Sequence, residues 1–297
     1  MNIRALLLPL FICSSVAAQN IENPEPPELV KKSRVRSVAV YMQNYNGGLP
    51  SGKPVDVSER MFDTLGNITD RVNAIYGTSI ITWVQYAYDS LHRKVKEVQL
   101  DGNAKVKNRT EYTYNAQSKV AEECIYDKEG KVVTKTVYTY DPAGNLLTAS
   151  FTDKSNGSKG KMEYKYNKKG KKTDELIYTE SGKIKSHTSF EYNKKGALVQ
   201  TVTADSAGKI TGKTLYTYDG EGRKTVYANL QGDKEVYKRV YTYKEGDMVA
   251  EYSEYTNGKL SSRCVFTYDK NRMISSIENY DDKNVLTAKF DYKYKYY

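Results

Sequence analysis

Tyr138-Thr139-Tyr140-Asp141-Pro142-Ala143-Gly144-Asn145 is the clearest copy of a motif that recurs along this 297-residue chain. The second aromatic of each copy falls at positions 88, 114, 140, 166, 192, 218, 243, 268 and 292, so the copies are 24 to 26 residues apart. One further step back from position 88 reaches Phe62, in a copy that lacks its first aromatic. Such regular spacing indicates a repeat protein of about ten units.

Each repeat is expected to form two strands and two turns. Tyr138 and Tyr140 are two residues apart and therefore point to the same face of a strand. The stretch from Asp141 to Gly144 suits a type I turn, because Asp can bond the backbone, Pro fixes φ and Gly accepts a positive φ at the exit. A second, looser turn follows, as at residues 126–131. No connection is long enough for a parallel crossover, so we predict an all-β fold: a single long antiparallel meander of about 20 strands.

The two faces of this sheet differ in character. Positions in phase with the motif are aromatic, as at Tyr164 and Tyr166, whereas out-of-phase positions such as Glu163 and Lys165 are mostly polar. One face is therefore expected to be wet, which antiparallel sheets permit. The sheet should be twisted and curled over its tyrosine-lined face. That face is either a sealed core or an open platform for ligands.

The N-terminal region is expected to direct export. A charged start and a short apolar run precede small residues before Gln19, which predicts a signal peptide at residues 1–18. Residues 19–54 are interpreted as an N-terminal linker with a first strand at 34–42 and a glycine- and proline-rich loop at 44–54. Residues 55–297 form the repeat domain. Its final segment, 290–297, reads as a lysine-bearing edge strand. We expect no transmembrane span, and a location in the periplasm, at the cell surface or outside the cell.

The composition argues against catalysis. His92 and His187 have no Cys or His at metal-ligand spacing, and the glycines occur singly rather than in a phosphate-binding loop. We therefore expect no catalytic residue, no metal site and no cofactor. His92 falls in a turn where other copies carry Gly, and His187 lies on the wet face. A carbohydrate-active enzyme remains an alternative, because its carboxylate pair is set by distance in the fold.

Cysteine usage and charge limit the partners. Cys124 and Cys264 are separated by about 11 strand steps of about 4.8 Å, which is too far for a disulfide. Each cysteine lies an even number of residues from an aromatic side chain, so the two point to the same face of the strand. We therefore predict two buried free thiols. The formal net charge is +10 and lysine dominates it. This positive charge favours solubility. The alternative is that it attracts an anionic polymer as a partner, and we expect no binding to nucleic acid.

Aromatic side chains are the candidate binding residues. Sugar rings stack on aromatic faces, so an open tyrosine face would bind glycans. Trp83 is out of phase with Tyr86 and Tyr88 and should lie on the wet face, either covered or in a contact surface. The complete candidate set is Tyr140, Tyr166, Tyr192, Tyr218, Tyr243, Tyr268 and Trp83.

The motif Tyr-x-Tyr-Asp-x-x-Gly, at residues 138–144 and 216–222, resembles the YD repeat of RHS-type bacterial surface proteins. The longer period and the second Gly-Lys turn are similar to exported Bacteroidetes repeat proteins of unknown function. This resemblance covers residues 60–297 and implies a curled sheet with its tyrosines inward. We expect an exported, non-enzymatic module that binds glycan or protein. The alternative is a purely structural scaffold with a sealed aromatic core.

Overall fold

The computed structural model describes residues 26–74 and 81–297. In these ranges, one short helix precedes a series of strands. The helix is α2 (Pro27–Lys32), and the strands are β1 (Val35–Asn46), β2 (Leu49–Phe62), β3 (Ile68–Ala74), β4 (Ile81–Tyr88), β5 (Lys94–Leu100), β6 (Val106–Tyr114), β7 (Val120–Asp127), β8 (Val132–Tyr140), β9 (Leu146–Asp153), β10 (Lys159–Tyr166), β11 (Lys172–Tyr178), β12 (Ile184–Tyr192), β13 (Leu198–Asp205), β14 (Ile210–Tyr218), β15 (Lys224–Gln231), β16 (Lys234–Tyr243), β17 (Val249–Thr256), β18 (Lys259–Tyr268), β19 (Ile274–Tyr280) and β20 (Leu286–Tyr296).

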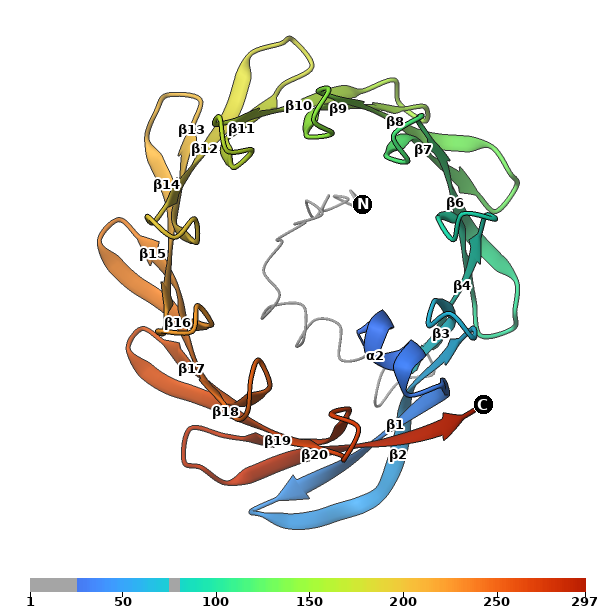
Figure 1. The fold of residues 1–297 in the computed structure, drawn as a ribbon, viewed down its shortest axis with the longest axis vertical. Helices are drawn as coiled ribbons and strands as arrows, with labels where there is room; N and C mark the ends of the chain where they lie inside the picture. Colours follow the sequence, from blue (N-terminus) through green and yellow to red (C-terminus); the bar gives the residue numbers. More distant parts are fainter. Residues whose placement is uncertain (1–25, 75–80) are drawn as a thin grey trace.

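The strands form one 20-stranded antiparallel sheet that closes into a barrel (Figure 1). Each strand pairs with its neighbours in the chain, and β1 pairs with both β2 and β20. Val40 of β1 thus lies opposite Ser58 on one side and Tyr292 on the other. The predicted all-β antiparallel meander is confirmed. The expectation of a charged edge strand at the C-terminal end is wrong, because β20 has a paired strand on each side.

The expected first strand at residues 34–42 is confirmed, but the expected loop at 44–54 is not a loop. Those residues form the end of β1, a turn at Gly47-Gly48 and the start of β2. Among the described residues, β3 pairs with β2 only from Ser58 to Phe62. Pro50 lies before that stretch, where β2 needs ladder bonds on one side alone, and a strand tolerates proline there.

The turns fall into two series at opposite ends of the barrel, one curling toward its axis and the other flaring outward (Figure 1). Asp141 begins one of the inward turns: its Oδ1 accepts the amide of Asn145 at 2.8 Å, and Gly144 adopts a φ of +81°. The same geometry recurs at Asp127 and Gly130 in the second series. His92 takes the left-handed position with a φ of +59°, where most of the equivalent turns carry Gly.

The aromatic phase of the motif faces the inside of the barrel. Helix α2 lies within the ring outline in Figure 1, and its fully buried Val30 packs against Phe62, Met273 and Tyr294. Phe62 and Tyr294 belong to that phase. A second cluster on the same face joins Tyr241, Val249, Cys264, Phe266 and Ile274. We call this side of the sheet the inner face and the opposite side the outer face.

Candidate functional site

A ladder of tyrosine hydroxyls runs around the inner face. Tyr140 Oη donates to the backbone oxygen of Val120 at 2.8 Å, twenty residues earlier. Equivalent bonds, 2.6 to 2.9 Å long, join Tyr88 to Ile68, Tyr114 to Lys94, Tyr166 to Leu146, Tyr192 to Lys172, Tyr218 to Leu198, Tyr243 to Lys224, Tyr268 to Val249 and Tyr294 to Ile274. The ladder identifies Tyr294, 26 residues after Tyr268, as the motif tyrosine of the last repeat. The sequence pattern had placed it at Tyr292, and that assignment is wrong.

The structure brings six of the predicted site residues into this ladder. Each donates its hydroxyl to the backbone, so a ligand would meet mainly ring surface; the six are Tyr140, Tyr166, Tyr192, Tyr218, Tyr243 and Tyr268. Trp83 does not join them. It lies on the outer face, where its Nε1 donates to Asp70 at 3.1 Å.

The inner face also carries glutamates directly opposite the first tyrosine of three motifs. Tyr86 pairs with Glu97, Tyr112 with Glu123, and Tyr164 with Glu175. Sequence reasoning missed these carboxylates, because it treated the acidic residues as part of the exposed strands. A signal was present, since Glu97 and Glu123 are 26 residues apart and Glu175 follows 52 residues later.

Lysines reach into the same sector. Lys94 forms an ion pair with Glu97 and lies 4.9 Å from the ring centroid of Tyr112. Lys172 lies 2.9 Å from Glu175 and 4.3 Å from the ring of Phe190. The side chains of Lys94 and Glu97 keep 37% and 28% of their surface exposed. This part of the inner face, from β4 to β12, therefore meets solvent, unlike the packed clusters beside β1 and β18. We call it the polar sector.

Glu123 differs from its two counterparts, because its repeat has Val120 where the others have lysine. Tyr138 Oη donates to Glu123 Oε2 at 3.4 Å. Burial raises the pKa of the Glu123 carboxyl above its ordinary value. Burial, followed by the charges of Glu97 and Glu123, raises the pKa of Tyr112. The polar sector thus holds a carboxyl group of raised pKa, that of Glu123, directly opposite Tyr112, whose pKa is raised as well.

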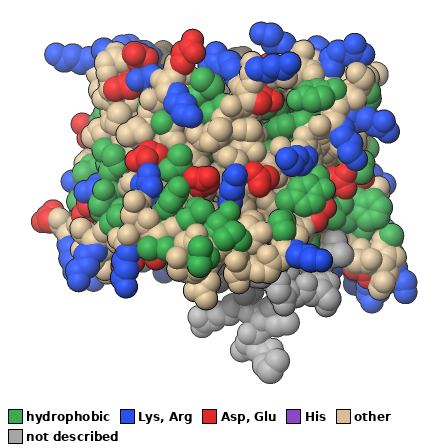
Figure 2. Space-filling model, turned by 90° about the horizontal axis from the view of Figure 1, so that it is seen from below, with side chains coloured by type: hydrophobic (Ala, Val, Ile, Leu, Met, Phe, Trp, Pro, Cys, Tyr) green, Lys and Arg blue, Asp and Glu red, His purple; other side chains and the backbone are tan. Residues whose placement is uncertain are grey.

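On the side of the barrel drawn in Figure 2, the outer face carries many charged side chains, and most of the basic ones lie toward the two rims. His187 lies on it, 2.7 Å from Asp174. Cys264 is a buried free thiol, as predicted. The prediction of burial is wrong for Cys124, which is half-buried on the outer face with its Sγ 3.4 Å from Glu122. Tyr126, two residues away on the same face of the strand, also lies on the outer face. Sharing a face with an aromatic residue therefore did not place Cys124 in the core.

Other kinds of site are not seen in the described residues. Across 26–74 and 81–297, no three His, Cys, Asp or Glu side chains gather closely enough to hold a metal ion. Within the same ranges, no helix combines the length and apolar character needed to cross a membrane.

A closed ring of YD motifs with tyrosines on its inner face defines a class of shell-forming repeat proteins. Residues 34–296 match the Teneurin YD-shell family, and the chain belongs to that family. The resemblance to YD-repeat proteins is thereby confirmed. No curated protein matches the chain.

Two solved structures illustrate the similarity. A Tc holotoxin pore from Photorhabdus luminescens is 14% identical, with a TM-score of 0.41; the match covers 84% of this chain and 14% of that one. A porin-like protein from Bacteroides uniformis is 13% identical, with a TM-score of 0.40; the match covers 88% of this chain and 98% of that one. This chain therefore spans only a small part of the toxin chain.

Proposed function

We propose that this chain is an exported, non-enzymatic shell protein whose inner face binds a glycan. The observation that carries the proposal is the polar sector, where tyrosine rings, lysines and glutamates remain in contact with solvent inside a closed barrel. Export is inferred from the expected signal peptide at residues 1–18, which lies outside the described residues. Its final compartment would be the periplasm, the cell surface or the medium.

The chemistry of the polar sector suits a saccharide. Tyr112 and Glu123 lie directly opposite each other on neighbouring strands, so one ligand can reach both side chains. The ring offers an apolar face for stacking, and the carboxylate accepts hydrogen bonds from sugar hydroxyls. The same pairing at Tyr86–Glu97 and Tyr164–Glu175 repeats this combination around the barrel. A repeated binding unit favours a polymer of repeated sugars.

A purely structural scaffold is the second candidate, and the tyrosine ladder favours it. The bond from Tyr140 to Val120 ties one repeat to the previous one, whatever the ring contains. Under this alternative, the inner tyrosines and glutamates would contribute to stability alone. A binding experiment with a matched pair of variants separates the two candidates.

The experiment is calorimetric titration of the mature protein with neutral and acidic oligosaccharides, comparing Glu123→Gln with Glu122→Gln. These glutamates are adjacent in β7, but Glu123 faces inward and Glu122 outward, 2.7 Å from Lys135. A hydrogen bond to a charged group contributes roughly 1.5–3 kcal/mol, so Glu123→Gln should weaken binding by about tenfold or more. Glu122→Gln should bind like the parent. If no sugar binds, or if Glu123→Gln and Glu122→Gln weaken binding equally, the glycan-binding proposal fails and the purely structural scaffold is favoured.

A further inference from the structure

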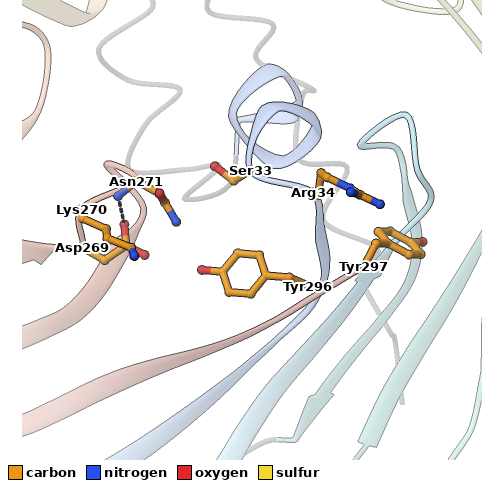
Figure 3. Close-up of a pocket in the computed structure, with 7 residues that line it drawn as sticks. All are labelled: Ser33, Arg34, Asp269, Lys270, Asn271, Tyr296 and Tyr297. Atoms are coloured by element: carbon orange, nitrogen blue, oxygen red, sulfur yellow. Dashed lines mark hydrogen bonds between the residues drawn. The ribbon is translucent and has the colours of Figure 1, made fainter.

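A pocket of about 730 Å³ opens at the seam where the barrel closes (Figure 3). Ser33 and Arg34 border it from the link between α2 and β1. The turn after β18 contributes residues 269–271, and Tyr296 and Tyr297 complete it. Its volume falls within the range of small-molecule sites, which is roughly 300–1,000 Å³. We call it the seam pocket.

The backbone around the seam pocket is held by several hydrogen bonds. Arg34 adopts a φ of +54°, and its carbonyl accepts the amide of Tyr297 at 2.9 Å. Tyr297 Oη donates to the backbone oxygen of Phe62. Asp269 Oδ1 accepts the amides of Asn271 and Met273 at 2.8 and 2.9 Å. The walls of the pocket are therefore fixed before any ligand arrives, which lowers the entropy cost of binding.

The side chains in the seam pocket combine positive charge with aromatic surface. Arg34 and Lys270 are exposed, and neither forms an ion pair with any of the described residues. The carboxylate of Asp269 is already bonded to the turn amides. Tyr296 and Tyr297 leave 45% and 47% of their surface exposed. Figure 3 shows the Tyr296 ring lying between the turn that carries Lys270 and the segment that carries Ser33.

We propose that the seam pocket binds the carboxylate-bearing sugar of an acidic glycan. Lys270 attracts the carboxylate, and the Arg34 guanidinium, which points toward Tyr297 in Figure 3, adds positive charge at the edge of the pocket. A tyrosine ring gives the sugar an apolar face to stack on. Ser33 and Asn271 supply hydroxyl and amide groups for the sugar hydroxyls. This site is separate from the polar sector and does not rest on the function proposed for it.

The test is calorimetric titration of the full chain with three probes: a uronic acid disaccharide, its neutral counterpart and inorganic phosphate. We expect the acidic disaccharide to bind and the other two to bind at least tenfold more weakly. Equal binding of phosphate would mean a general anion site, and equal binding of the neutral sugar would mean that the cations take no part. Either result, or no binding of the acidic sugar, would overturn the proposal.

Substitutions inside and outside the seam pocket show where the acidic disaccharide binds. Lys270→Gln and Tyr296→Ala should each weaken binding of the acidic disaccharide by about tenfold. Lys168→Gln is the matched control, because Lys168 is exposed at the same position of an equivalent turn. It should bind like the parent, and an equal loss there would indicate attraction by overall charge. Glu123→Gln should leave this binding unchanged, so the seam pocket and the polar sector can fail independently.

Discussion

The hydroxyl of Tyr140, at the end of β8, donates to the backbone oxygen of Val120, at the start of β7, across 2.8 Å. The side chain of one repeat thereby satisfies a backbone group of the preceding one. With its equivalents, this bond forms a circle of contacts around the tight-turn end of the barrel. The second tyrosine of the motif therefore has a structural role in addition to any role in binding.

Replacing Tyr140 by Phe should lower the free energy of unfolding by about 1 kcal/mol, because one hydrogen bond is lost and a half-buried carbonyl is left unpaired. Tyr164→Phe is the control on the same face, since among the described residues its hydroxyl donates just one weak hydrogen bond, to the sulfur of Met162 at 3.5 Å. It should change stability by much less. Urea denaturation followed by circular dichroism measures both, and equal losses would count against the ladder.

The turn at residues 219–223 offers a test of backbone strain with two identical substitutions. Gly222 adopts a φ of +83°, whereas Gly220 does not have a positive φ, and a Cβ on either would meet no atom within 4 Å. Gly222→Ala should cost about 1–2 kcal/mol, because L-residues disfavour the left-handed region. Gly220→Ala should be neutral or slightly stabilising. Thermal unfolding compares them, and similar melting temperatures would contradict the argument.

Met273 tests the packing of α2 at the seam. It is fully buried beside Val30, Val38 and Phe62. Met273→Ala should lower the free energy of unfolding by about 2–5 kcal/mol, which is typical of a methionine lost from a packed core. Met61→Ala removes the same atoms from a side chain that is 40% exposed and should have a small effect. If denaturant unfolding shows that Met273→Ala and Met61→Ala lose the same free energy of unfolding, the packing of Met273 beside α2 adds no stability.

The sequence predicted the meander because its signals are local and repeated. Nearly every unit has counterparts of Asp141 and Gly144, which mark a turn. It also has counterparts of Tyr138 and Tyr140, which mark one face of a strand. Closure of the barrel has no such signal, because Val38 and Tyr294 pair across almost the whole length of the chain. It depends on the curvature accumulated over all the strands. Ring closure therefore had to come from the structure.

The candidate sites were predictable to different degrees. The six candidate tyrosines in the ladder follow from the motif, and Glu97, Glu123 and Glu175 could have been found from their spacing. The seam pocket could not, because Arg34, Lys270 and Tyr296 belong to three segments that no sequence pattern relates. Only the closing of β20 against β1 brings them together.

Alkaline pH should destabilise the barrel. Burial raises the pKa of several inner tyrosines to about 12, namely Tyr88, Tyr164, Tyr243 and Tyr268. In the unfolded chain the pKa of tyrosine is near 10, so above that pH the unfolded state binds fewer protons than the folded state. The contribution of these groups to stability is complete below pH 10 or so and is lost as the pH rises toward 12.

Tyr164→Phe isolates this effect from the deprotonation of lysines, which both proteins share. The variant lacks one tyrosine of raised pKa, so its stability should decline less steeply between pH 10 and 12 than that of the parent. Urea denaturation at several pH values measures the slopes, and absorbance at 295 nm follows tyrosinate formation. The inner tyrosines should ionise only as the far-ultraviolet circular dichroism is lost. Their ionisation near pH 10 in an intact barrel would show that burial does not raise their pKa values.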